Sequence, residues 1–452
     1  MTIGKISKWQ PTHGGNAILL VLGVLLAVVA LAMVVIPALS PSEEAAPGVA
    51  LTEPGESTTD SAIEFWEARV RSTPGDVSAH NKLALAYIQR ARESGDVTDY
   101  AMAQAQVDAS LESERDNYEA LALQASLHVT RNEYALALET ANAAIAQDSV
   151  DPFARAVAGD ALLGLGDYDA ALETYRELVE ASPSLTSYSR LARIHELRGD
   201  APAAEAAWQN AFEVDDGQRP ENTAWARVEY GHYLFTHGDI AGADAQYQSA
   251  LETFPGYIHA LAGRARVAAA NGQYDEAIAL YEQLTERQPV FEYVVALGDV
   301  YLAAGRKADA ESEFELAGTL DSLYRESGIN TDGQMALFLT DHDLRLEEAV
   351  DQAAGAYEAH PNSIYTADAL SWALHKAGRN EEALTYSERA VRLGTQDANI
   401  LFHASMINFH ADNHETAHGY LKQVMDTNPK FSLIYAGQAA ATLEELNKLV
   451  SN

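Results

Sequence analysis

The sequence predicts an all-α protein, a right-handed solenoid of about ten helix pairs that follows one N-terminal transmembrane helix. Two observations lead to this prediction. A sequence pattern as long as one short helix recurs with a spacing of about 34 residues. An uncharged run, Ala17–Ile36, precedes these repeats. The chain has 452 residues, 47% of them hydrophobic. A single hydrophobic core does not normally extend over a chain of this length. Stacked helical units avoid this limit, because each unit buries its apolar surface against the next.

The apolar run near the N-terminus predicts a membrane anchor. At 1.5 Å per residue, its roughly 20 residues span about 30 Å, the thickness of a hydrocarbon core. Lys5 and Lys8 precede the run and Glu43 follows it, so the positive-inside rule places residues 1–16 in the cytoplasm. We therefore predict a single-pass signal-anchor helix at residues 17–39 in the inner (cell) membrane, with the repeats on the periplasmic side. The alternative is a cleaved signal peptide, whose apolar region is normally shorter, about 7–15 residues.

Two short segments separate this anchor from the repeats. Residues 40–61 are rich in Pro, Gly, Ser, Thr and Glu and have no apolar period, which predicts a flexible linker. Residues 62–76 carry an amphipathic pattern that ends near Pro74, which predicts a helix that caps the array.

The stretch Gly166–Pro183 shows how each repeat is built. Gly166 ends the preceding helix, and Asp167 is placed to cap the next one. Ala171, Tyr175 and Leu178 then fall on one helical face, and Pro183 prevents continuation. Similar signals recur at Gly199, Gly238, Gly272, Gly305, Gly378 and Asp412. The first helix of each pair carries a large residue followed by a small one, as in Tyr230-Gly231 and Leu297-Gly298, which lets two helices approach closely.

This pattern resembles the tetratricopeptide repeat, and the resemblance covers about five-sixths of the chain. The repeats are expected at 77–117, 118–151, 152–184, 185–218, 224–257, 258–290, 291–324, 330–363, 364–397 and 398–431. We predict a first array at 77–324, a C-terminal array at 325–431 and a capping helix at 432–452. Residues 325–329 break the period and suggest a hinge. The segment from Ala336 through Trp372 to Ile407 is similar to a group of bacterial tetratricopeptide proteins.

The resemblance implies a concave groove, lined by the first helix of each pair, that binds other proteins or peptides. Aromatic side chains in such a groove are good anchors for an apolar peptide side chain. The alternative is that several of them pack between repeats. The expected partner-binding residues are Trp225, Phe235, His259, Arg266, Tyr365, Trp372, His375, Phe402, Met406 and Phe409. The same register also places Asn81, Phe153, Asp160, Arg193, His232, Asp299, Phe338, Asp368 and His410 in the groove.

Composition excludes several other classes of function. The formal net charge is −36, from 66 acidic and 30 basic residues, which argues against a nucleic-acid-binding surface. The chain has no cysteine, so disulfides, thiol nucleophiles and cysteine-ligated metal sites are excluded. No catalytic motif is present, and we predict neither an enzyme nor a cofactor.

Individual residues suggest two other kinds of binding site, a carboxylate clamp and a metal site. Asn81 matches one position of a clamp for a partner's C-terminal carboxylate, but its companion residues are missing, which disfavours that clamp. Histidines gather late in the chain, and a metal-binding protein is an alternative function. These histidines are His375, His403, His410, His414 and His418.

The sequence therefore predicts a membrane-anchored scaffold or adaptor that binds protein partners in its groove outside the cytoplasm. Envelope assembly, secretion and cytochrome maturation are the processes we consider, by analogy with other anchored repeat proteins. An exported soluble protein of the same binding class is the alternative if the N-terminal segment is cleaved.

Overall fold

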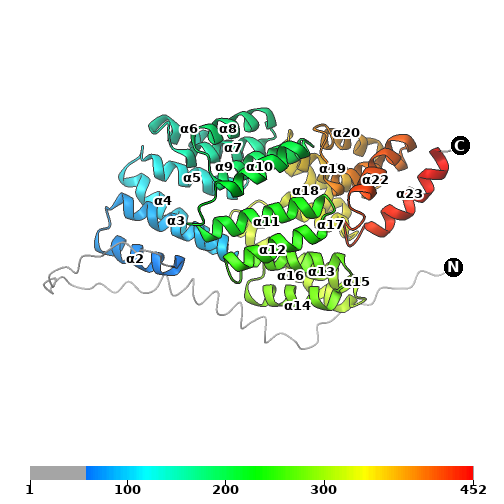
Figure 1. The fold of residues 1–452 in the computed structure, drawn as a ribbon, viewed down its shortest axis with the longest axis horizontal. Coiled ribbons are helices and arrows are strands. Elements are labelled where there is room, and N and C mark those ends of the chain that lie inside the picture. Colours follow the sequence, from blue (N-terminus) through cyan, green and yellow to red (C-terminus); the bar gives the residue numbers. More distant parts are fainter. Residues whose placement is uncertain (1–57, 451–452) are drawn as a thin grey trace. The chain divides into compact units, whose positions relative to one another are not determined.

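The computed structural model describes residues 58–450, and the described residues form twenty-two α-helices and no strand (Figure 1). The prediction of an all-α solenoid is confirmed. The first described helix is α2 (Thr59–Ser72) and the last is α23 (Ala436–Val450). Within residues 58–450 no helix is long and apolar enough to cross a membrane. The predicted anchor at residues 17–39 lies outside the described residues.

Between these two helices lie ten helix pairs, of which the fifth begins at Pro220, before the expected start of its repeat at residue 224. In chain order the pairs are α3 (Val77–Ser94) with α4 (Thr98–Ser113), α5 (Tyr118–Thr130) with α6 (Tyr134–Gln147), α7 (Pro152–Leu165) with α8 (Tyr168–Ala181), α9 (Leu185–Leu197) with α10 (Ala201–Glu213), α11 (Pro220–Thr236) with α12 (Ile240–Thr253), α13 (Ile258–Ala270) with α14 (Tyr274–Arg287), α15 (Phe291–Ala303) with α16 (Lys307–Glu326), α17 (Asp332–Asp341) with α18 (Leu346–Ala359), α19 (Ile364–Lys376) with α20 (Asn380–Ala390), and α21 (Ala398–His410) with α22 (His414–Thr427).

Helix α8 forms as its sequence predicts. Asp167 caps it by accepting a hydrogen bond from the amide of Ala170, and Gly166 before it has a left-handed backbone with φ of 79°. Ala171, Tyr175 and Leu178 are all buried. The small residues of the first helices have the expected role, because Gly231 lies against the ring of Tyr247 and Gly298 against that of Phe314. A Cβ at either glycine would overlap the ring, at 2.5 and 2.3 Å.

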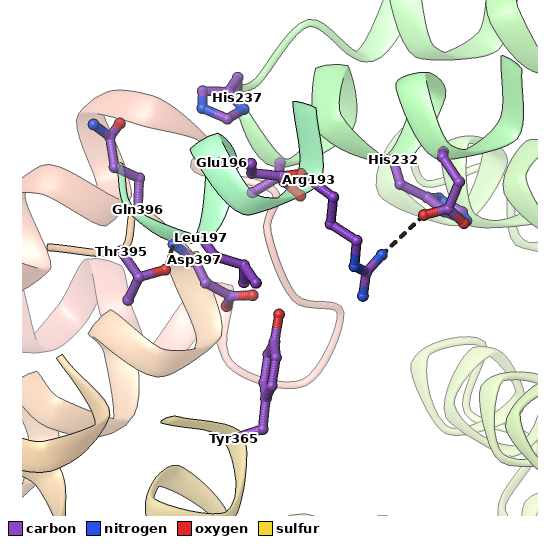
Figure 2. A pocket seen from close by; sticks show the side chains of 11 residues that line it. Arg193, Glu196, Leu197, His232, His237, Tyr365, Thr395, Gln396 and Asp397 are labelled. Atoms are coloured by element: carbon purple, nitrogen blue, oxygen red, sulfur yellow. Dashed lines mark hydrogen bonds and ion pairs between the residues drawn. The ribbon is translucent and has the colours of Figure 1, made fainter. Parts of the chain in front are cut away.

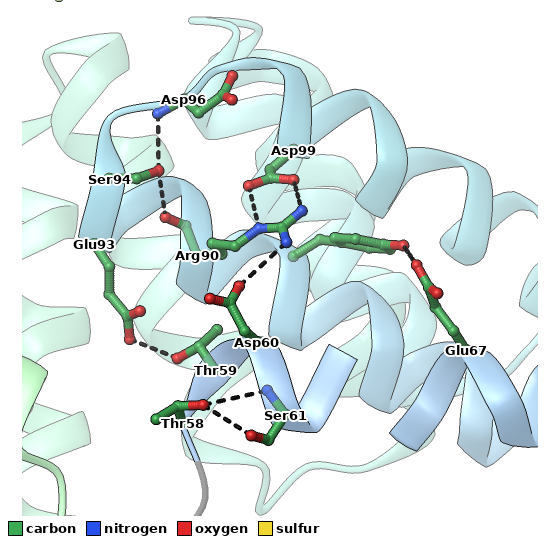
Figure 3. A network of polar contacts seen from close by, with 11 residues as sticks. Thr58, Thr59, Asp60, Ser61, Glu67, Arg90, Glu93, Ser94, Asp96 and Asp99 are labelled. Atoms are coloured by element: carbon green, nitrogen blue, oxygen red, sulfur yellow. Dashed lines mark hydrogen bonds and ion pairs between the residues drawn. The ribbon is translucent and has the colours of Figure 1, made fainter. Parts of the chain in front are cut away.

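Polar contacts attach the first described helix to the array (Figure 3). Arg90 of α3 forms a two-pronged ion pair with Asp99 of α4, at 2.6 and 2.8 Å, and reaches Asp60 of α2 at 3.3 Å. The Tyr87 hydroxyl donates to Glu67 of α2 at 2.7 Å. Helix α2 begins at Thr59, earlier than the expected Ala62, because the hydroxyl of Thr58 accepts from the Ser61 amide.

The apolar core continues across the irregular stretch at residues 325–329. Phe291 and Leu320 before it and Met335 and Leu339 after it belong to one buried cluster. Helix α16 runs past the expected end of its repeat to Glu326, and Arg325 forms ion pairs on either side, with Asp321 and Asp332.

The array coils back so that turns nearly 200 residues apart touch each other. At Gly166, a Cβ would lie 2.1 Å from the carbonyl oxygen of Asn362. At Gly199 it would lie 2.2 Å from the carbonyl oxygen of Gly394, and at Gly238 it would lie 2.1 Å from that of Thr427. Only a residue without a side chain allows backbone to meet backbone this closely. We call these three contacts the seam.

Hydrogen bonds run along the seam and continue on both sides of it. The amide of Ile364 donates to the hydroxyl of Tyr168 at 2.9 Å, across 196 residues. The side-chain amide of Asn428 donates to the carbonyl of Phe235 at 2.7 Å. Further contacts join Asn132 to Asn330, Gln396 to Gly199, and Lys430 to Asn271. These contacts therefore provide hydrogen-bond partners for polar groups of the loops, which would otherwise bond to water.

Substitution of glycine by alanine at the seam tests this packing. Gly166 and Gly378 both have φ of 79°, but a Cβ at Gly378 meets nothing within 4 Å. We expect Gly378→Ala to lower the free energy of unfolding by about 1–2 kcal/mol, because alanine is disfavoured in a left-handed backbone conformation. Gly166→Ala should lower it by about 1–3 kcal/mol more, because its Cβ would also overlap the carbonyl of Asn362. Urea unfolding followed by circular dichroism measures both, and equal losses of stability would contradict a packed seam.

Candidate functional site

Two adjoining cavities lie on the inner side of the seam. The larger has a volume of about 620 Å³ and the smaller about 190 Å³. Helices α7, α9 and α11 supply one side of the larger cavity, and α17 and α19 supply the other. Both cavities are lined by Arg193, Glu196, Glu229 and Tyr365, so they lie next to each other.

Five aromatic side chains line the larger cavity. Trp225 of α11 is half-buried, and Tyr365 of α19 keeps 43% of its surface exposed. Tyr134, Tyr175 and Trp208 complete the aromatic lining. Trp208 is only 2% exposed, and its indole N–H has no acceptor among the described residues. Such a wall offers apolar contact area with few rotatable bonds, which suits an apolar or aromatic group of a ligand.

An ion pair between Arg190 and Asp160 lines the same cavity. Arg190 of α9 binds both carboxylate oxygens of Asp160 of α7, at distances from 2.8 to 3.1 Å. The hydroxyl of Tyr175 donates to the same carboxylate at 2.8 Å. This geometry is bidentate and hydrogen-bonded, so it holds α7, α8 and α9 together rather than leaving a free charge.

The smaller cavity is lined mainly by polar side chains (Figure 2). Figure 2 shows Arg193 of α9 and the hydroxyl end of Tyr365 of α19 pointing into the space between α9, α11 and α19. Arg193 donates to Glu229 of α11 at 2.9 Å. Glu196 and Asp397 add two further carboxylates, and Asp397 also caps α21 by accepting from the amides of Asn399 and Ile400.

The ionisation of these groups follows from their burial. Desolvation raises the pKa of Glu196 to about 7, against a smaller lowering by Arg193. Desolvation also raises the pKa of Asp397 above its usual value, against hydrogen bonds from two amides. It lowers the pKa of His232 to about 4, so this imidazole is neutral at pH 7. A carboxyl group whose pKa lies near 7 and that lines a cavity is a common feature of functional sites.

The predicted groove residues divide into two groups. Trp225 and Tyr365 line the larger cavity, together with Asp160 and Arg193 of the wider prediction, and His232 lines the smaller one. The others lie elsewhere. Phe235 is 1% exposed beneath the guanidinium of Arg266, which lies 3.9 Å from its ring centre. His259 is held by the hydroxyl of Tyr293 at 2.5 Å and the carbonyl of Arg92 at 3.1 Å.

The predicted C-terminal aromatic anchors are mostly core residues, which corrects the expectation that they are exposed. Trp372, Phe402 and Met406 are at most 2% exposed. The reason is the closing segment, because Phe431 and Tyr435 pack over them. The indole N–H of Trp372 donates to Asp341 at 2.9 Å, and Phe409 packs against the same cluster. His375 stacks on Trp372 and shares a hydrogen bond with the side chain of Asn380.

The late histidines bond to protein groups rather than to one another. His403 pairs with Asp368 at 3.0 Å, His410 bonds the carbonyl of Met406, and His418 contacts Asn447. Within residues 58–450 no three potential ligands are placed to hold a metal ion. Asn81 is buried and hydrogen-bonded to Ser110, Asn117 and Glu119, so its side chain supports the first repeats.

Sequence reasoning missed the carboxylates of the smaller cavity, which are Glu196, Glu229 and Asp397. Glu196 lies one helical turn after Arg193, and its position in a first helix was an available signal. Asp397 carried no signal of this kind, because it lies in a loop that only the coiling of the array brings to α9.

Comparison with known families agrees with this architecture. Residues 88–152 and 157–221 match one family model and residues 234–297 match another, and both models are described as tetratricopeptide repeat. The chain is a tetratricopeptide repeat protein. No protein with a curated description matches it.

Several solved structures resemble this tetratricopeptide repeat protein. A thermophilic tetratricopeptide repeat protein from Thermus thermophilus is 19% identical, over 43% of this chain and 97% of its own, with a TM-score of 0.37. The pilF protein of Pseudomonas aeruginosa is 20% identical, over 48% of this chain and 94% of its own, with a TM-score of 0.33. The human IFIT1 dimer with PPP-AAAA is 13% identical, over 81% of this chain and 86% of its own, with a TM-score of 0.46. At these values the likenesses carry no argument about function.

The placement of Trp372 and Tyr365 predicts different effects of truncation. Trp372→Ala removes a buried ring from the C-terminal core and should cost about 3–5 kcal/mol of stability. Tyr365→Ala removes a ring that is 43% exposed in a cavity and should cost less than about 1 kcal/mol. Thermal unfolding of both variants measures the difference. A Trp372→Ala variant as stable as the natural chain would contradict its assignment to the core.

Proposed function

We propose that this tetratricopeptide repeat protein is a membrane-anchored scaffold or adaptor that binds a segment of a partner protein in the cavity behind the seam. One observation carries the proposal: the adjacent cavities are lined mainly by first helices from both sides of the seam, with Trp225 and Tyr365 on the wall. The lining combines apolar area with fixed polar groups, which is the arrangement that ligand-binding pockets show.

The dimensions favour a segment over a folded domain. A cavity of about 620 Å³ lies within the range of about 300–1,000 Å³ in which pockets enclose a ligand of a few side chains. An extended segment also matches the general use of helical repeats, whose inner faces bind chains in extended or helical form. Tetratricopeptide repeats typically serve as scaffolds without enzymatic activity, and we propose no reaction for this chain.

Photo-crosslinking tests whether the cavity is the binding site. A photoreactive phenylalanine at position 365 should give covalent adducts with a partner in living cells, because this side chain faces the cavity and is 43% exposed. Leu323 of α16 is the matched control, since it is 40% exposed but lines neither cavity. Mass spectrometry then identifies the adducts. Equal yields at the two positions, or none at position 365, would contradict the proposal.

The proposed location of the protein in the cell rests on the sequence. The apolar run at Ala17–Ile36, with lysines before it and acidic residues after it, supports an inner-membrane anchor and periplasmic repeats. Envelope assembly, secretion and cytochrome maturation are the processes in which we would look for the partner. An exported protein with a cleaved signal is the second candidate.

Carbonate extraction separates these two candidates. The anchored chain should remain in the membrane pellet, because a span of about 20 apolar residues is not released by high pH. A variant that starts at residue 40 is the control and should appear in the supernatant. Release of the full chain into the supernatant would contradict the anchor.

A further inference from the structure

We propose that the smaller cavity binds a cationic side chain, lysine or arginine, of the partner segment that occupies the larger cavity. This inference rests on the proposed function and names the chemistry of its ligand. It follows from the size of the smaller cavity, its charge and the position of the Tyr365 hydroxyl.

The size of the smaller cavity fits one side chain. At about 190 Å³ it is below the range of about 300–1,000 Å³ that holds a whole small ligand. It shares Arg193, Glu196, Glu229 and Tyr365 with the larger cavity, so a segment in the larger cavity would lie beside it.

The charges around the smaller cavity leave two carboxylates without a cation. Arg193 is engaged by Glu229 at 2.9 Å. His232 bonds the hydroxyl of Tyr247 at 2.8 Å. Among the described residues, no cation forms an ion pair with Glu196 or Asp397, which come from α9 and from the N-cap of α21. An anionic ligand would meet this excess of negative charge, whereas an ammonium or guanidinium group neutralises it.

The hydroxyl group of Tyr365 supports the same chemistry. It points into the space between α9, α11 and α19 (Figure 2), and its oxygen can accept a hydrogen bond from an ammonium or guanidinium group.

Acidification should weaken binding of the cation. The groups that face Glu196 are Arg193 of its own helix, Glu229, His232 and His237 of α11 and its C-cap, Tyr365 of α19, and Asp397. Burial raises the pKa of Glu196 to about 7, so its carboxylate is ionised above pH 7 and neutral well below it. Affinity for a cationic segment should therefore be higher at pH 8 than at pH 5.5.

Binding of peptide pools to the full-length chain tests the inference. Four pools of blocked heptapeptides share random flanks and differ in the central residue, which is lysine, arginine, leucine or glutamate. We expect the lysine and arginine pools to bind about tenfold more tightly than the leucine pool at pH 8, and the glutamate pool to bind weakest. The double variant Glu196→Gln with Asp397→Asn should remove this preference, and asparagine still caps α21.

The matched control is Glu311→Gln with Glu315→Gln, which removes two exposed carboxylates from α16 and should leave the preference unchanged. Equal binding of the leucine and lysine pools, or a preference that survives the double variant, would overturn the cation site while the proposed function stands. Binding of no pool would contradict both. A preference that does not weaken between pH 8 and pH 5.5 would contradict the role of Glu196.

Discussion

Backbone contact between loops nearly 200 residues apart constrains the whole repeat array. In a solenoid each repeat normally touches only its neighbours, so its curvature is set by many small local rotations. Here the turns at Gly166, Gly199 and Gly238 also meet the loops at Asn362, Gly394 and Thr427. The missing side chain at each glycine makes this approach possible, and a left-handed backbone at the same position ends the first helix. One residue type thus satisfies a local and a long-range requirement together.

The seam places a second part of the array opposite an inner face of the first. Without it, α7, α9 and α11 would present their inner side chains to open solvent. With it, α17 and α19 lie opposite, and Glu196, Glu229, Asp397 and Tyr365 border the same small volume. Burial of the carboxylates makes their ionised forms unfavourable unless a cation compensates them. This unfavourable burial of negative charge is the basis of the binding chemistry that we propose.

Much of the fold could be predicted because its rules are local. The cap at Asp167, the buried face of Ala171, Tyr175 and Leu178, and the close approach at Gly298 all follow from residues within one repeat. The site was only partly predictable. Repeat register found Trp225, Tyr365 and Arg193, because these lie on inner faces. It did not find Asp397, and it misplaced Trp372 and Phe402, because their surroundings come from segments that local periodicity does not describe.

The distance between paired turns tests the closed array most directly. The natural chain has no cysteine, so a pair introduced as Asn132→Cys with Asn330→Cys is the only pair of thiols present. The Asn132 side chain donates to the Asn330 carbonyl at 2.9 Å, across 198 residues. A short bismaleimide should therefore link the two cysteines rapidly within one chain and leave the helical circular dichroism unchanged. Failure of this intramolecular link in the folded chain would contradict the seam and the cavity that depends on it.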